Sequence, residues 1–201
     1  MLKKSLFCLI FLLSFATVSI HADNSQFYNV KEKSYFTGTV FELASKNKLV
    51  GTVVKSRFRV RTNYDLYDAK GNYEATAVCR VLTLGLFYEW ATEMDVYDSK
   101  GNRIGVIDGQ AVTMASAKFS FYDAKGQHVG IGYLDINNTG FIIVDPKNDY
   151  HVLAQYTRRF VENTIDSWDV AIFDQDQISP AMLHIFGAFA VDTQSAFQED
   201  T

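Results

Sequence analysis

Hydrophobic and polar residues alternate along most of the chain after its first thirty residues. Phe119 and Phe121 alternate with polar neighbours, and Val129 and Ile131 do so after a short polar interruption. A period of two, rich in aromatic and β-branched residues, is typical of half-buried strands. The same reasoning predicts strands at residues 36–43, 49–61, 141–144 and 150–156. We therefore expect an all-β-dominated fold with about a dozen short antiparallel strands.

A recurring phrase separates these strands. It reads Tyr-Asp-Ala-Lys-Gly-Asn at residues 67–72 and recurs, with small changes, at residues 97–102 and 122–127; a degenerate copy occupies residues 144–149. An Asp at the first turn position can bond forward to the turn backbone, and a Gly at the fourth supplies a positive φ. The phrase therefore predicts tight hairpins. It lacks the additional acidic ligands of a calcium loop.

The end of the chain has a different pattern. Ser179 and Pro180 suit the N-cap and the first position of a helix, and residues 181–191 are almost wholly apolar. A helix that is apolar on every face must be buried. Eleven residues span about 16 Å, roughly half of a hydrocarbon core of ~30 Å. We expect this helix to fill a β-barrel whose inner face is lined by the apolar alternates of the strands.

Residues 1–22 have the features of a secretory signal peptide. Lys3 and Lys4 precede a nearly continuous apolar run at residues 6–20, and Ala22 offers a cleavage site. The alternative is an uncleaved N-terminal anchor. Cleavage would leave one domain at residues 23–201, exported to a periplasm or the extracellular space. The mature chain would carry 17 basic and 23 acidic residues and a single cysteine, Cys79, which excludes an intramolecular disulfide.

Composition narrows the class of protein further. The chain is 48% apolar and 21% charged, which excludes a disordered state, and its net charge of -4 argues against nucleic-acid binding. No nucleophile elbow, phosphate loop or metal-protease motif occurs. We interpret Cys79 and His184 as core residues, the latter hydrogen-bonded, and His128 and His151 as exposed. The sequence thus predicts a protein without enzymatic activity and without a cofactor.

Two features resemble the tubby C-terminal-like superfamily, and within it the LURP-one-related proteins and the phospholipid scramblases. The first is the repeated Tyr-Asp-x-Lys-Gly hairpin. The second is the ending at residues 168–176, which leads into the apolar helix and Asp192. The likeness covers roughly residues 36–192. It implies a twelve-stranded antiparallel barrel around a C-terminal hydrophobic helix.

A basic segment stands out against the acidic background. If residues 55–61 continue a strand, Lys55, Arg57, Arg59 and Arg61 share one face, and Phe58 and Val60 point to the core. Such a stripe could bind lipid phosphates or another polyanion. Tubby domains bind phosphoinositide head groups through basic residues, although no position of this chain can be matched to theirs. The alternative is a solvated strand face, or a charged edge that prevents aggregation.

The best candidates for metal ligands are in the acidic group Asp166, Asp169, Asp174 and Asp176, and we select Asp174 and Asp176 from it. Scramblases carry an acidic calcium segment before the equivalent helix, so the resemblance implies a weak calcium site here. Both carboxylates also suit a turn that precedes a helix N-terminus.

Three functions follow from these observations. The first is a non-enzymatic module that binds an anionic phospholipid head group or polyanionic surface, with peripheral rather than integral membrane contact. The second is a scaffold that binds a protein partner and no small ligand. The third is a scramblase-like, calcium-responsive lipid protein.

Overall fold

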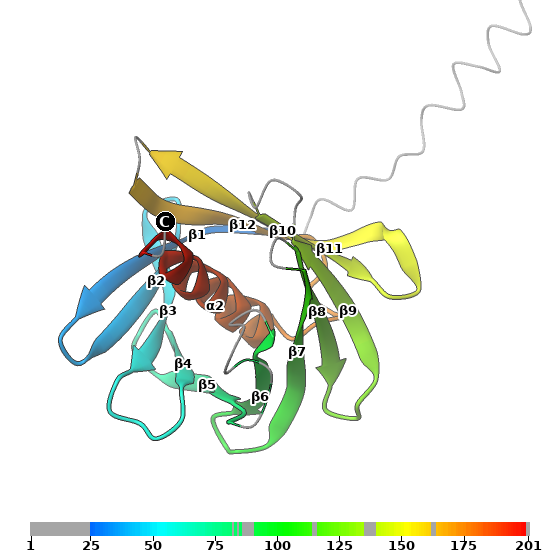
Figure 1. Cartoon of the computed structure of the whole chain (residues 1–201), viewed down its shortest axis with the longest axis horizontal. Helices are drawn as coiled ribbons and strands as arrows, with labels where there is room; N and C mark the ends of the chain where they lie inside the picture. The colour runs from blue at the N-terminus through cyan, green and yellow to red at the C-terminus, as the bar shows by residue number, and fades with distance from the viewer. Residues whose placement is uncertain are drawn as a thin grey trace, which may run out of the picture.

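The computed structural model describes residues 25–81, 83, 85, 91–113, 116–134, 140–161 and 164–199. They form a closed barrel of twelve antiparallel strands around a C-terminal helix, as the sequence predicts (Figure 1). The strands are β1 (Gln26–Tyr35), β2 (Gly38–Ser45), β3 (Lys48–Ser56), β4 (Asn63–Asp68), β5 (Tyr73–Cys79), β6 (Glu93–Asp98), β7 (Arg103–Thr113), β8 (Ser116–Asp123), β9 (His128–Leu134), β10 (Gly140–Asp145), β11 (Asn148–Val161) and β12 (Thr164–Ile172). The proposed signal peptide, residues 1–22, lies outside the described residues.

Each strand pairs with its neighbours in sequence, and β1 closes the barrel against β12. Asn29 on β1 faces Asp169 on β12 across this closure, and its amide donates a hydrogen bond of 3.1 Å to the Asp169 carboxylate. Because successive strands run in opposite directions, their connections alternate between the two ends of the barrel. The β1–β2 and β3–β4 connections therefore share one end, and the four turns of the recurring phrase share the other, which we call the turn end.

The recurring phrase forms tight hairpin turns, as predicted. In the first copy, Asp68 Oδ1 accepts hydrogen bonds of 2.8 Å from the backbone amides of Lys70 and Asn72. Gly71 adopts a φ of +83°, and its counterparts Gly101 and Gly126 have nearly the same φ. The side chain fixes the backbone of the turn, and the glycine removes the steric cost of a positive φ.

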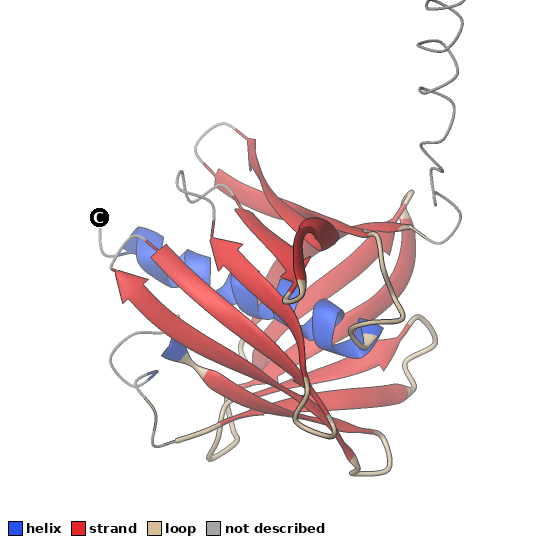
Figure 2. Ribbon diagram, turned by 90° about the vertical axis from the view of Figure 1, so that its right-hand side faces the viewer, coloured by secondary structure: helices blue, strands red, loops and turns tan. Residues whose placement is uncertain are grey.

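Helix α2 (Pro180–Glu199) passes through the barrel (Figure 2). It begins as predicted, since the Ser179 carbonyl accepts a hydrogen bond of 2.9 Å from the amide of Met182. It extends beyond the apolar segment at residues 181–191 that the pattern identifies. The helix starts at the turn end, because it follows β12, and it runs toward the end that carries the β3–β4 connection.

The core is built around aromatic side chains. Phe186 on α2 lies at the centre of a cluster, and its ring centroid is 5.0–5.3 Å from those of four wall residues. They are Phe119, Phe121, Phe141 and Tyr156. All five side chains are fully buried, at relative exposures of 1% or less. Edge-on ring contacts of this kind add to the stabilisation that apolar burial provides.

Three details of the wall differ from the sequence-based prediction. β1 was not predicted, because only Tyr28 and Val30 of its ten residues are buried apolar side chains. The strand expected at residues 36–43 begins instead at Gly38, since Phe36 lies in the β1–β2 turn. In β9 the residues on the interior face are Gly130 and Gly132. The alternation predicts larger apolar side chains on that face. A Cβ on Gly130 would lie only 2.4 Å from Ile178, so this position must remain open for the segment that enters the helix.

Candidate anion-binding site

The basic segment is a loop beyond Lys55 and Ser56. β3 ends at Ser56, and residues 57–62 connect it to β4. We call residues 57–62 the basic loop. The expected strand stripe of Lys55, Arg57, Arg59 and Arg61 is therefore wrong in its geometry. Phe58 and Val60 were expected in the core, but their relative exposures are 72% and 103%. The strand stops here because its partner β2 begins at Gly38, opposite Ser56, so the ladder has no further residues to pair.

Lys55 belongs to the interior of the barrel end. Its Nζ lies 2.6 Å from Asp192 Oδ2 on α2, and the Tyr64 hydroxyl on β4 donates a second hydrogen bond of 2.6 Å to the same oxygen. The side chains of Lys55 and Asp192 are 34% and 14% exposed. A partly buried pair that shares a hydroxyl donor is a structural contact. Asp192 therefore ties the helix to two strands, and it already balances the charge of Lys55.

Arg59 is also balanced by a carboxylate. Its guanidinium Nη2 lies 2.7 Å from Asp65 Oδ2, and the Asp65 side chain is only 4% exposed. Asp65 also accepts a hydrogen bond of 2.6 Å from the Thr76 hydroxyl. This buried carboxylate anchors the middle of the basic loop onto β4, and it neutralises the charge of Arg59.

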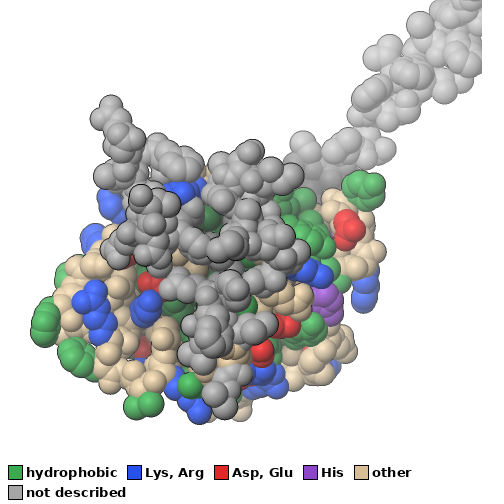
Figure 3. Space-filling view, viewed as in Figure 1, with side chains coloured by type: hydrophobic (Ala, Val, Ile, Leu, Met, Phe, Trp, Pro, Cys, Tyr) green, Lys and Arg blue, Asp and Glu red, His purple; other side chains and the backbone are tan. Residues whose placement is uncertain are grey.

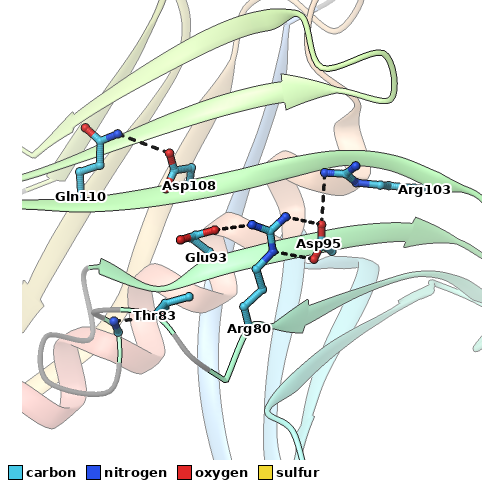
Figure 4. A network of polar contacts seen from close by, with 8 residues as sticks. Arg80, Thr83, Glu93, Asp95, Arg103, Asp108 and Gln110 are labelled. Atoms are coloured by element: carbon cyan, nitrogen blue, oxygen red, sulfur yellow. Dashed lines mark hydrogen bonds and ion pairs between the residues drawn. The ribbon is translucent and has the colours of Figure 1, made fainter.

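Arg80, just after β5, lies in a second charged network on the outer face of the wall (Figure 4). It forms a bidentate contact with Asp95 at 2.8 and 2.9 Å, and it also pairs with Glu93. Arg103 reaches Asp95 at 3.3 Å. The hydrogen bond from Arg80 is the main reason that the pKa of Asp95 is lowered, and Asp95 in turn raises the pKa of Arg80. The charge of Arg80 is therefore engaged within this network.

Arg57 and Arg61 differ from these residues. Both side chains are exposed, and neither forms an ion pair with any residue in the described part of the chain. Figure 3 shows Lys and Arg side chains beside hydrophobic ones along the lower left edge, where Figure 1 places the β1–β2 and β3–β4 connections. Of the four predicted site residues, the structure leaves Arg57 and Arg61 available to an external anion.

A cavity of about 280 Å³ opens beside the basic loop. Arg61 and Thr62 of the basic loop line it together with Lys55, Tyr64 and Asp192. Cys79 also lines it, and burial raises the pKa of its thiol to about 12. Such a thiol is almost entirely protonated at neutral pH and is a poor nucleophile. Sequence reasoning missed this cavity, because its walls come from strands and a helix that are distant in the chain.

The predicted metal residues occupy the segment between β12 and α2. Asp174 Oδ1 accepts hydrogen bonds from the amides of Asp176 and Gln177, at 2.9 and 3.3 Å, which is the turn role that the sequence also allowed. His151 Nε2 lies 3.7 Å from Asp174 Oδ2. Among the residues that the structure describes, no three His, Cys, Asp or Glu side chains are grouped as they would be to hold a metal ion.

The other histidines are placed as follows. His151 is exposed, as predicted, whereas His128 is half-buried and stacks on Tyr122 with ring centroids 5.1 Å apart. The expectation that His128 is exposed was therefore wrong. His184 packs edge-on against Tyr28 at 4.9 Å. Its Nε2 is buried without a hydrogen-bond partner among the described residues, so the predicted hydrogen bond is absent at this nitrogen. Burial lowers the pKa of His184 to about 4.

Fold and site together define a closed twelve-stranded β-barrel with an internal helix and a basic loop at one end. The chain matches no protein-family model, and no curated protein sequence matches it. Within the described residues, no helix combines the length and the apolar character that crossing a membrane requires.

Proposed function

We propose that this protein is a non-enzymatic binding module for an anionic surface, either phospholipid head groups or another polyanion. The observation that carries the proposal is the contrast within the basic loop. Arg59 is neutralised by Asp65, whereas Arg57 and Arg61 on either side of it are exposed and form no ion pair with the described residues. Guanidinium groups bind phosphate oxygens through paired hydrogen bonds. Arg57 and Arg61 lie on one short loop, with three residues between them, so both can contact one such surface together.

Two further expectations belong to this proposal. The features of residues 1–22 favour export, so the module would act in a periplasm or outside the cell. The barrel around α2 is the architecture that the resemblance to tubby-like, LURP-one-related and scramblase-like proteins implies, and it supports that resemblance. The resemblance also implies a calcium role for Asp174 and Asp176, whereas the Asp174 carboxylate accepts hydrogen bonds from the amides of Asp176 and Gln177 within their turn.

The test is vesicle binding by the mature protein, with and without phosphatidylglycerol in phosphatidylcholine vesicles. A basic residue near an anionic bilayer contributes about 1 kcal/mol, so the Arg57→Gln/Arg61→Gln variant should bind about 30-fold more weakly. The matched control is Lys100→Gln/Lys125→Gln, which removes the same charge from exposed turns at the turn end. That control should bind like the wild type.

Equal affinity of both variants would contradict the proposal. Retention of a stoichiometric protein partner, with no binding to anionic vesicles or heparin, would favour the scaffold instead. A calcium-dependent rise in Tm that Asp174→Asn abolishes would favour the scramblase-like alternative.

A further inference from the structure

Large apolar side chains project from the same end of the barrel as the basic loop. Val60 is fully exposed, Phe36 is 87% exposed and Phe58 is 72% exposed. Phe36 lies in the β1–β2 turn, whereas Phe58 and Val60 lie in the basic loop. The two connections are neighbours, because the Arg57 amide donates a hydrogen bond of 3.3 Å to the Thr37 carbonyl. These apolar residues therefore form one protruding group, which we call the apolar tip (Phe36, Phe58 and Val60).

Single exposed apolar side chains are common on soluble proteins. The apolar tip is different because its members lie on adjacent connections, and because Phe58 and Val60 alternate with arginines. The turns of the recurring phrase at the other end consist of small or polar residues, as the exposed run from Ser99 to Asn102 illustrates, and the most exposed aromatic side chain beside them, Tyr150, carries a hydroxyl. Folding does not require the tip to be apolar, since neither Phe58 nor Val60 packs into the core. An apolar group that the fold does not use is the usual mark of an interaction surface.

We propose that the apolar tip inserts into the interfacial region of an anionic lipid bilayer while Arg57 and Arg61 bind the lipid phosphates. The inference rests on the proposed function, and it narrows the anionic partner to a membrane. Peripheral proteins place aromatic and aliphatic side chains about 5–10 Å into the boundary between head groups and acyl chains. Arginines that flank such side chains remain at the level of the head groups.

The apolar tip and the arginines beside it together favour a bilayer over other partners. A soluble polyanion offers phosphates or sulfates to Arg57 and Arg61 but has no apolar phase for Phe36 and Phe58. A second copy of this chain would bring the unpaired arginines of two basic loops together, and like charges at an interface are unfavourable. A bilayer provides an anionic layer for the arginines. Beneath it lies an apolar layer for the side chains of the apolar tip.

Insertion can be measured with a fluorophore on the loop. Phe58→Cys in the mature chain can be labelled with an environment-sensitive dye, because the pKa of about 12 keeps the Cys79 thiol unreactive. Anionic vesicles should shift the dye emission to the blue, and quenchers attached to the lipid chains should reduce it. Ser99→Cys, labelled in the same way at the turn end, is the matched control and should show neither effect.

Affinity gives an independent readout. Phe36→Ser/Phe58→Ser should weaken binding to anionic vesicles by about 10- to 100-fold and leave retention on heparin unchanged, since it removes apolar insertion and keeps the arginines. Tyr150→Ser, which alters a side chain that is 98% exposed elsewhere, is the control and should have no effect. An unchanged Tm will confirm that each variant is folded.

The outcomes separate this inference from the proposed function. If Phe36→Ser/Phe58→Ser binds vesicles like the wild type while Arg57→Gln/Arg61→Gln does not, insertion is wrong and anion binding stands. If neither variant loses affinity, both proposals fail. If the wild type sediments as a dimer that Phe36→Ser/Phe58→Ser converts to a monomer, and does not bind vesicles, the tip is an interface between copies and the inference is overturned.

Discussion

Lys55 on β3 and Asp192 on α2 form an ion pair of 2.6 Å that fastens the far half of the central helix to the wall of the barrel. The Tyr64 hydroxyl completes the contact at the same carboxylate oxygen. The pair stands at one wall of the cavity beside the basic loop. Lys55, which the sequence places in a ligand-binding stripe, is therefore primarily a structural residue.

Asp192→Asn should lower the free energy of unfolding by about 1–3 kcal/mol, because it leaves the partly buried Lys55 ammonium without its counter-charge. Urea denaturation will measure the loss. Asp149→Asn, at an exposed position at the start of β11, is the control and should change stability little.

A double-mutant cycle with Lys55→Met tests the pairing directly. The two substitutions together should cost less than the sum of their separate effects, by about 0.5–3 kcal/mol. Additive effects would show that Lys55 and Asp192 act independently.

The buried His184 side chain should make the protein sensitive to mild acid. Its pKa is about 4 in the folded protein, and an unfolded histidine has a pKa of about 6.5. The unfolded state therefore binds more protons between these values, so the free energy of unfolding should fall as the pH decreases through this window. The loss should reach up to about 3 kcal/mol below the lower pKa.

His184→Leu should flatten this dependence between pH 6.5 and 4, while His151→Gln, at an exposed position, should not. Chemical denaturation at a series of pH values is the measurement. A slope that survives in His184→Leu would assign the acid sensitivity to other groups.

The hairpin glycines should contribute to stability because they adopt a positive φ, and not because a larger side chain would clash with a neighbour. Gly101 has a φ of +82°, and a Cβ there would meet no atom within 4 Å. Gly101→Ala should therefore destabilise the fold by about 1 kcal/mol without any clash. Gly132→Ala is the matched control, since its Cβ would make ordinary contacts of 3.5 Å with Phe121. Equal losses of Tm in both variants would rule out the conformational explanation.

Cys79 should be inert in the folded protein. With a pKa of about 12, its thiolate fraction at pH 8 is about a thousandfold below that of a free cysteine. A native chain of residues 23–201 should therefore react with iodoacetamide far more slowly than the same chain in urea. Equal rates would show that burial does not protect this thiol.

The sequence predicts the architecture well because that architecture depends on local signals. Asp68 and Gly71 determine their turn within a few residues, and Ser179 and Pro180 mark the start of the helix. The site is less predictable. Residues 57–62 contain none of the usual turn residues, Gly, Pro, Asn and Asp, so their alternation extends the strand pattern past Ser56.

What ends β3 is the absence of a paired residue on β2 beyond Gly38, which is a property of the assembled sheet. The ion pairs that balance the charges of Lys55 and Arg59 likewise depend on partners from other elements. Asp192 is 137 residues away from Lys55 along the chain. No local pattern identifies such a partner, so the pattern alone cannot distinguish balanced cations from available ones.

The order of the elements along the chain has a consequence for biogenesis. The barrel closes only when β12 reaches β1, as the contact between Asn29 and Asp169 across 140 residues illustrates, and the helix that fills it follows β12. Neither closure nor core is thus available to a nascent chain until nearly all of it has been synthesised. Long-range pairing of this kind makes folding slow. The closed barrel with its filled core therefore requires helix α2, and residues 180–199 decide when the polypeptide becomes a stable protein.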